Sequence, residues 1–322
     1  MSQGGTSWSR GTALLRQGAH LADHSGMAKE KEPVRLRRLP FWVSAPLIVG
    51  TFAALLWGER RRPLRRAVEP KLRRNARNLA VAGMAAATTH LVGAPVLAPL
   101  TQAVARNRWG LVPRLGLPVW VEVPLSLLLL DYTLYLWHVL THKVPWLWRF
   151  HQVHHVDLDL DASTATRFHF GELTMATAWN AAEVLVIGVT PLTLSCRQTL
   201  LLVSILFHPS DVRLPIEVER RLGRFVVTPR MHGIHHSIVQ EETDSNWSSG
   251  LSVWDRLHGT LQLGIPQDEV TIGVAAYRDP AEVTLPRLVA LPFEREQRPT
   301  AELPDGTRPV REVAGPPGRL LP

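Results

Sequence analysis

Histidine is the residue type in this chain whose number and spacing point to chemistry. Ten of the 14 histidines lie between His138 and His236. Eight of these ten fall into three short boxes, which are His138-Val-Leu-Thr-His142, His151-Gln-Val-His154-His155 and His232-Gly-Ile-His235-His236. In a helix, residues three and four positions apart share a face, so each box predicts a set of imidazole rings that point to one side.

Neutral imidazole is a ligand for iron, zinc and copper. Eight imidazoles are too many for one four-coordinate zinc ion, but they suffice for two metal ions with about four nitrogens each. Two ions a few ångströms apart can hold and activate a small oxidant between them. Incidental core packing and a low-complexity chelating tract are the alternatives, and three separate boxes flanked by Trp, Phe, Leu and Arg fit neither of them.

Composition bounds the class of protein. The chain has 322 residues, is 45% hydrophobic and carries a net charge of +8. This apolar content is too high for a disordered chain. Its one cysteine, Cys196, excludes an intramolecular disulfide, cysteine-ligated zinc fingers and iron–sulfur clusters.

Four apolar stretches predict a multi-pass membrane protein. Three of them have the length of single spans, and the fourth is too long for one span and contains Pro191 near its middle. The fourth therefore predicts a hairpin of two short helices that turns near Thr190-Pro191, with Glu183 and Arg197 either paired inside it or reaching an interface. The stretches are 41–58, 78–105, about 117–141 and about 173–207.

A basic block separates the first two stretches. It runs from Arg60 to Arg77 and contains nine Lys and Arg residues but no aromatic residue. Nucleic acid is therefore disfavoured as a partner, and the positive-inside rule places this loop in the cytoplasm. The block is either a topology anchor alone or also a docking face for an acidic electron carrier.

Residues 120–275 resemble the fatty acid hydroxylase/sterol desaturase superfamily of membrane-bound di-iron enzymes. The resemblance rests on the three boxes and on the segments that flank them. These segments are Asp131-Tyr132-Thr-Leu-Tyr135-Leu-Trp137, Leu147-Trp148-Arg149-Phe150, Thr166-Arg167-Phe168-His169, Phe207-His208, Thr228-Pro229-Arg230-Met231, Asp244-Ser245-Asn246 and Trp254-Asp255-Arg256-Leu-His-Gly259-Thr260.

The resemblance implies which residues bind metal. The box histidines are the implied ligands, His208 matches a further ligand position, and His169 is either another ligand or a group behind the ligands. Where the family has an Asn after the His208 position this chain has Asp211, which either ligates, bridges or hydrogen-bonds a ligand. The implied ligands are His138, His142, His151, His154, His155, His208, His232, His235, His236 and His169.

A ligating histidine usually donates its other N–H to a carboxylate or a carbonyl group. Asp131 lies seven residues before His138 on one helix face, so it is a candidate partner, and a packing hydrogen bond to Tyr or Trp is the alternative. The other candidates are Asp211, Asn246, Glu172, Asp244 and Asp255; for Asp255, a structural corner in Trp254-Asp255-Arg256 is favoured.

The implied function is O₂-dependent hydroxylation or desaturation of an unactivated C–H bond in a lipid such as a sterol or fatty acyl chain. Two iron ions are the implied cofactor, zinc is able to replace them on purification, and O₂ is the cosubstrate. We find no dinucleotide or haem-binding motif, so a separate ferredoxin, cytochrome or reductase is the implied electron donor. The alternative is a non-oxidative metal-binding membrane protein, either a zinc hydrolase or a scaffold.

The predicted fold is therefore all-α, with about four spans, including the hairpin, beneath a cytoplasmic helical cap that carries the histidines. We expect a basic N-terminal tail over residues 1–40 and N-terminal membrane helices over 41–115. The catalytic domain is expected over 116–275 and a Pro-rich C-terminal tail over 276–322.

Overall fold

The structure is a computed structural model in which residues 36–311 are described, and the statements below refer to these residues. They form helices, turns and three isolated β-bridges, without a β-strand. This confirms the predicted all-α class. Most of the predicted N-terminal tail and the end of the predicted C-terminal tail lie outside the described residues.

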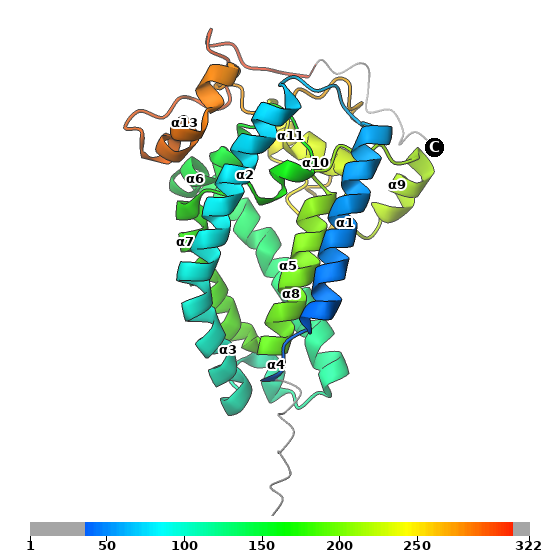
Figure 1. Ribbon diagram of the computed structural model, residues 1–322, viewed down its shortest axis with the longest axis vertical. Helices are drawn as coiled ribbons and strands as arrows, with labels where there is room; N and C mark the ends of the chain where they lie inside the picture. The colour runs from blue at the N-terminus through cyan, green and yellow to red at the C-terminus, as the bar shows by residue number, and fades with distance from the viewer. Residues whose placement is uncertain (1–35, 312–322) are drawn as a thin grey trace, which may run out of the picture. The chain divides into compact units, whose positions relative to one another are not determined.

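The longer helices run side by side beneath a group of short ones (Figure 1). A π-helical segment (η2, Thr89–Gly93) joins α2 to α3, and another (η4, Val184–Gly188) extends α7. The longer helices are α1 (Phe41–Arg61), α2 (Lys71–Thr88), α3 (Ala94–Asn107), α5 (Val119–Lys143), α7 (Phe170–Glu183) and α8 (Pro191–Phe207). The short helices are α4 (Leu111–Arg114), α6 (Pro145–His155), η3 (Ala162–Thr166), α9 (Ile216–Leu222), α10 (Pro229–His235), α11 (Gln240–Thr243), α12 (Val253–His258), η5 (Pro280–Val283), α13 (Leu285–Ala290) and η6 (Leu291–Phe293).

Three segments are long and apolar enough to cross a membrane, namely Phe41–Arg61, Lys71–Arg114 and Val119–Lys143. Their outward faces carry large apolar side chains, as at Trp42 and Leu79, which are 75% and 73% exposed. Exposed apolar area on this scale suits a lipid environment. The second segment starts seven residues earlier than expected, since α2 already includes the end of the basic block.

The fourth apolar stretch folds as the predicted hairpin. Helix α7 and η4 run in one direction, and α8 begins with Pro191 at its first turn. The chain turns at Gly188, whose φ is +91° and whose Cβ, if it had one, would lie 2.3 Å from Pro113 Cδ. Within the hairpin Glu183 pairs with Arg197 at 3.6 Å, as one of the two predicted alternatives required.

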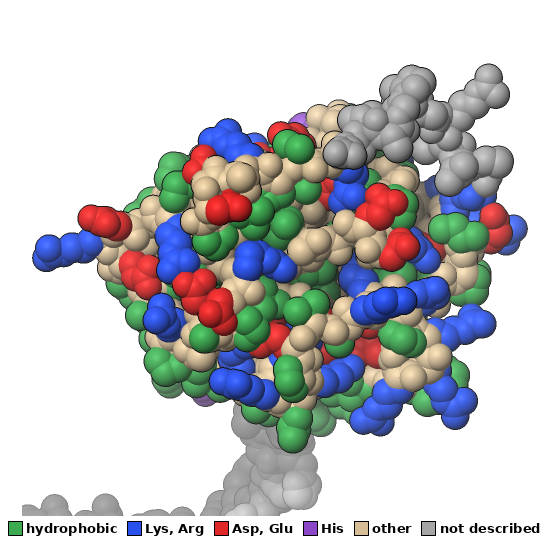
Figure 2. Space-filling model, turned by 90° about the horizontal axis from the view of Figure 1, so that it is seen from above, with side chains coloured by type: hydrophobic (Ala, Val, Ile, Leu, Met, Phe, Trp, Pro, Cys, Tyr) green, Lys and Arg blue, Asp and Glu red, His purple; other side chains and the backbone are tan. Residues whose placement is uncertain are grey.

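The short helices other than α4 form what we call the cap, at the end of the bundle that Figure 2 views from above; α4 lies at the opposite end, beside η4. An apolar core ties α2 and α6 to the segment 274–291; its members include Val81, Val153 and Leu288. The C-terminal segment is held down further by ion pairs of Arg311 with Glu242 and Glu269. Residues 276–311 are therefore packed onto the cap.

A buried ionic network joins α2 to the segment that follows α6, and its centre is Asp157, which is fully buried. Arg74 makes two hydrogen bonds to the Asp157 carboxylate, of 3.0 and 2.8 Å, and a third to Asp161 of 2.7 Å. Arg77 and Arg167 contact the same carboxylate at 3.1 and 2.9 Å. These three cations hold the pKa of Asp157 well below its usual range, despite the opposing effect of burial.

We predict that Arg74→Met destabilises the folded protein by about 3–5 kcal/mol, because it leaves buried carboxylates without their main cation. Thermal unfolding of the purified protein in detergent measures this, with Arg73→Met as the matched control. Arg73 lies one position earlier on α2 and is exposed. Equal unfolding temperatures for the two variants would show that the network contributes no stability.

Candidate metal centre

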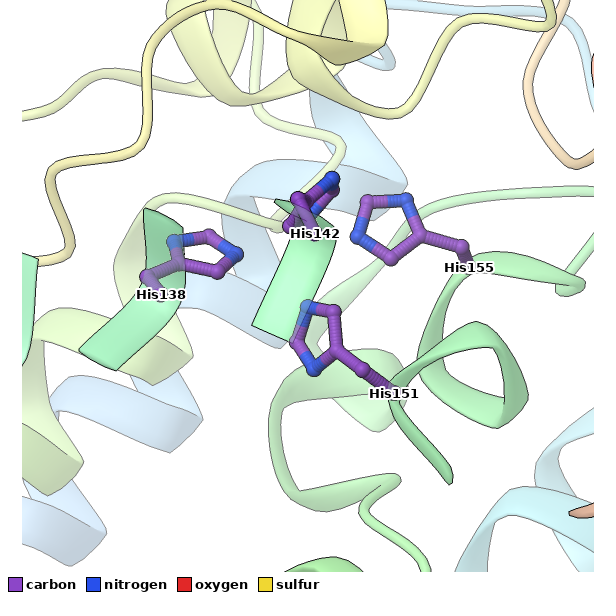
Figure 3. A group of neighbouring side chains, drawn as sticks. All are labelled: His138, His142, His151 and His155. Atoms are coloured by element: carbon purple, nitrogen blue, oxygen red, sulfur yellow. The ribbon is translucent and has the colours of Figure 1, made fainter. Parts of the chain in front are cut away.

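The end of α5 and the whole of α6 bring the first two histidine boxes together. Pro145 cannot continue α5, and Val144 before it is extended (φ −97°, ψ 111°), so the chain turns sharply into α6. His138 and His142 from α5 then face His151 and His155 from α6 (Figure 3). The four rings point toward one another, with neighbouring centroids about 5 Å apart.

The third box lies on α10, which begins with the Thr228 side chain as its N-cap and Pro229 in its first turn. His232 and His236 form a second group with His154 of α6. Their nearest ring centroids, of His232 and His236, are 4.4 Å apart. Helix α6 therefore contributes to both groups: His151 and His155 belong to the first and His154 to the second, which differs from the prediction that all three rings of this box point to one side.

The two groups share a border. His155, His235 and His236 also form a group whose potential ligand atoms lie within 4.8 Å of one another. The rings of His155 and His236 are stacked with their centroids 4.1 Å apart. The eight box histidines thus form one continuous cluster with two centres.

His208 and His169, the two further candidate ligands, are placed differently. His208 follows the last turn of α8, and its ring centroid is 4.1 Å from that of His232. His169 is the N-cap of α7, where its Nδ1 accepts a hydrogen bond from Gly171 N at 3.0 Å, and its Nε2 lies 3.3 Å from the carbonyl oxygen of Val289. Both ring nitrogens of His169 are therefore engaged, and only His208 adjoins the box histidines.

Three box histidines are oriented by hydrogen bonds from Nδ1. In each pair the partner oxygen accepts, so the ring N–H is on Nδ1 and the lone pair is on Nε2. The Nδ1 atoms of His138, His151 and His235 lie 2.6 Å from Trp247 O, 2.9 Å from Glu172 Oε1 and 2.8 Å from Ser245 O, respectively.

The unpaired ring nitrogens of the histidine cluster make it suitable for binding metal ions. Among the described residues, each box histidine and His208 has at least one buried ring nitrogen without a hydrogen-bond partner. Buried polar atoms are normally paired, and leaving so many unpaired would cost free energy unless another ligand binds them. Imidazole nitrogens in this number are a donor set for iron, zinc or copper.

Burial also sets the protonation state of these rings. It lowers the pKa of His208 and His235 to about 3, with neighbouring histidines adding to the effect on both. The pKa of His154, His155, His232 and His236 is lowered for the same two reasons. Near pH 7 the rings are neutral and their lone pairs are available to a metal ion.

Aromatic side chains close the cluster. Phe168 stacks on His154 with centroids 4.8 Å apart, and Trp148 packs against His142 at 4.9 Å. The C-terminal segment adds a polar contact to α6, where Gln297 accepts a hydrogen bond from buried Gln152 at 2.8 Å. These contacts exclude water from the rings.

The structure places the three acidic or amide candidates away from the rings. Asp131 accepts hydrogen bonds from Trp254 Nε1 (2.7 Å) and Leu251 N (3.0 Å), which is the packing alternative. Asp211 accepts from Arg65 N, and burial raises the pKa of Asp211 to about 6. Asn246 bonds to backbone groups of Met231 and Gln262. Asp211 and Asn246 therefore differ from their predicted contacts with a ligand histidine, whereas for Asp131 the packing alternative is the one observed.

The other candidates divide. Glu172 receives the His151 N–H, whereas Asp244 pairs with Lys143 at 2.8 Å. Asp255 accepts from the backbone N–H groups of Trp247 and Ser248, as the favoured structural corner requires. The sequence did not reveal that the backbone carbonyl groups of Trp247 and Ser245 accept hydrogen bonds from His138 and His235, since every residue has a carbonyl group and its side-chain type gives no signal. The sequence also did not single out Asp157, although the aspartates at positions 157, 159 and 161 closely follow the second box.

Comparison with known proteins gives matches in one family. The fatty acid hydroxylase family profile matches residues 123–260, which include all three boxes. Ornithine lipid hydroxylase OlsE from Rhizobium tropici is 30% identical over 56% of this chain and 53% of its own length. Cholesterol 25-hydroxylase from Mus musculus is 30% identical over 44% of this chain and 47% of its own length. Human alkylglycerol monooxygenase is 29% identical over 41% of this chain and 28% of its own length.

These matches confirm the predicted resemblance. The chain spans about half the length, or less, of the curated relatives it matches. A search of the solved structures finds no significant match.

We predict that Glu172→Gln weakens metal binding roughly 10- to 100-fold, because the neutral amide no longer raises the basicity of the His151 ring as the carboxylate does. Metal affinity measured by competition with a chelator tests this. Glu183→Gln is the matched control, since Glu183 is a buried glutamate of the same helix that bonds to Trp179 rather than to a histidine. The role of Glu172 is refuted if both variants bind metal equally.

Proposed function

We propose, because residues 123–260 match the fatty acid hydroxylase family profile, that this chain is a membrane-bound, metal-dependent lipid hydroxylase of that family. The observation that carries the proposal is the continuous cluster of buried histidines with unpaired ring nitrogens at one end of apolar helices. The named relatives act on ornithine lipid, cholesterol and alkylglycerol, so the proposed substrate is a lipid, and desaturation is a second outcome of the same attack on a C–H bond.

The residues divide between two proposed metal sites. His138, His142, His151 and His155 would hold one ion. His154, His232 and His236, with His208 beside them, would hold the other, and His235 lies on the border. Two iron ions held there would supply the redox chemistry by which O₂, two electrons from a separate donor and two protons convert a C–H bond to an alcohol, with the second oxygen atom released as water.

The protein itself positions the histidine rings and excludes water from them. Glu172 and the carbonyl groups of Trp247 and Ser245 fix the tautomer and direction of three rings. Phe168 and Trp148 keep water from the cluster, so reactive species are used on the substrate. The catalytic segment is proposed as 116–275, covered by residues of the C-terminal segment.

The proposed orientation places the cap in the cytoplasm. Six cations of the basic block remain exposed near the cap ends of α1 and α2, where the positive-inside rule expects them; they are Arg60, Arg61, Arg62, Arg66, Lys71 and Arg73. Others do not act as free charges, because Arg74 and Arg77 are buried in ion pairs. Only the exposed set is available for docking a ferredoxin, cytochrome or reductase.

We predict two iron ions per chain in wild-type protein purified in mild detergent from iron-supplemented, anaerobic cells. His154→Ala should lose at least one of them and at least 100-fold in O₂-dependent lipid turnover, because a ligand is missing. Elemental analysis and product detection by mass spectrometry measure the two quantities. His90→Ala is the matched control, since His90 is exposed on η2. His169→Ala should also keep both ions, given its other partners.

One metal ion or none in the wild type would contradict the two-metal site. Two zinc ions without O₂ consumption, even after iron loading, would favour the alternative of a zinc hydrolase or scaffold.

A further inference from the structure

A polar cavity of about 820 Å³ lies beside the histidine cluster but is not part of it. Its walls come from the α1–α2 connection, the segment after the second box, and residues 267–272. Arg230 of α10, two residues before His232, and Asp211, three residues after His208, also line it. The cavity therefore borders three of the segments that carry histidines. On the face of the cap that Figure 2 shows, Lys and Arg side chains are interspersed with Asp and Glu.

The charged groups of the cavity are unevenly paired. Seven Lys and Arg side chains line it, against five Asp and Glu. Four of these carboxylates already have partners in the protein. Glu69 pairs with Arg77 and Asp161 with Arg74, while Asp159 accepts from two backbone N–H groups and Asp211 from Arg65 N.

Several cations lack such a partner. Arg213 donates to the carbonyl groups of Pro63 and Leu64, and Arg278 to that of Ile272. Arg66 is exposed. Among the residues that the structure describes, none of these three guanidinium groups forms a salt bridge with a carboxylate. Each keeps planar N–H donors that match the oxygens of a phosphate or carboxylate.

Arg65 adds a buried charge to the cavity wall. Its side chain is 8% exposed, and its Nη2 donates to Pro229 O and Gln267 Oε1, both at 2.6 Å. Its Nη1 is 3.9 Å from Asp211, and neither Nη1 nor Nε has a hydrogen-bond partner. The charge of this guanidinium is thus only partly compensated by the protein.

The position of the cavity makes it accessible to the headgroup of a membrane lipid. The α1–α2 connection joins two candidate membrane spans at their cap ends, which is the depth of lipid headgroups if both helices cross. We propose that this cavity binds an anionic phosphate or carboxylate group through Arg66, Arg213 and Arg278, beside the buried charge of Arg65. The group is either the headgroup of a lipid or a free anion; that the lipid is the substrate rests on the proposed hydroxylase function, whereas anion binding does not.

The test uses the full, metal-loaded chain in uncharged detergent and isothermal titration calorimetry. Three probes are compared, namely inorganic phosphate, dihexanoyl phosphatidate and dihexanoylglycerol, which has the same chains without the charge. The variant is Arg66→Gln with Arg278→Gln. The control is Arg62→Gln with Arg73→Gln, which removes two exposed charges of the same basic block outside the cavity.

We expect the cavity variant to weaken phosphatidate binding by about tenfold and the control by less than twofold. Dihexanoylglycerol should bind more weakly than phosphatidate to the wild type. Arg213→Gln alone should weaken binding in the same direction, which guards against misfolding of the double variant. Preserved metal content and unfolding temperature confirm the fold.

The probes separate the two sources of the anion. Phosphatidate binding much tighter than phosphate identifies a lipid headgroup site, and equal binding identifies a free-phosphate site. The proposal is overturned if the wild type binds neither anion, if phosphatidate and dihexanoylglycerol bind equally, or if both double variants behave alike. None of these measurements depends on catalytic turnover. Failure of the proposed hydroxylase function would instead appear in the metal content and in the absence of a hydroxylated lipid product.

Discussion

The arrangement of the cap depends on one buried carboxylate, Asp157, two residues after His155. A fully buried carboxylate is tolerated only with cations around it, and Arg74, Arg77 and Arg167 supply them. Two of these arginines belong to α2, the cap end of a candidate membrane span. Arg167 also donates to Val153 O inside the second box. The network therefore fixes the second box relative to a helix that contributes no histidine, and the rings of the other boxes are placed against that box.

The two halves of the molecule solve different physical problems. The apolar helices need only pack against each other and face lipid, as the cluster that includes Leu97, Leu130 and Ile187 does. The cap must bury many imidazoles whose nitrogens have no partner inside the protein. Hydrogen bonds from the outer nitrogens and stacked aromatic rings hold those imidazoles in place. An unpaired buried nitrogen is costly in the absence of metal, so metal binding is expected to contribute to the stability of the cap.

Much of the fold and of the histidine cluster could be predicted from the sequence, and the features that could not be predicted have physical explanations. The helix period of the boxes and the lengths of the apolar stretches predicted the all-α class and the hairpin at Pro191, and the boxes with their flanking segments carried the resemblance to the family. The partners of the rings were harder. Asp131 has the right spacing for His138 but turns to Trp254, and two of the observed acceptors are backbone carbonyl groups, which any residue offers. The basic block looked uniform in the sequence, because the burial of Arg74 and Arg77 depends on Asp157, which lies about 80 residues away in the chain, as well as on the nearby Glu69 that pairs with Arg77.

Helix α1 lies outside the segment matched to the family, yet its last turn reaches the cap. Glu59 is 4% exposed, and its carboxylate accepts hydrogen bonds from Ala162 N (2.7 Å) and Asp211 N (3.1 Å). Ala162 opens the helical turn after the second box, and Asp211 follows His208. A carboxylate at this position therefore connects two histidine-bearing segments through backbone donors that would otherwise be buried and unpaired. The same turn leads into the α1–α2 connection that walls the arginine-lined cavity. The N-terminal helix is thus a structural part of the cap as well as a candidate membrane span, and this explains why Glu59 in its last turn is buried although the arginines that follow it are exposed.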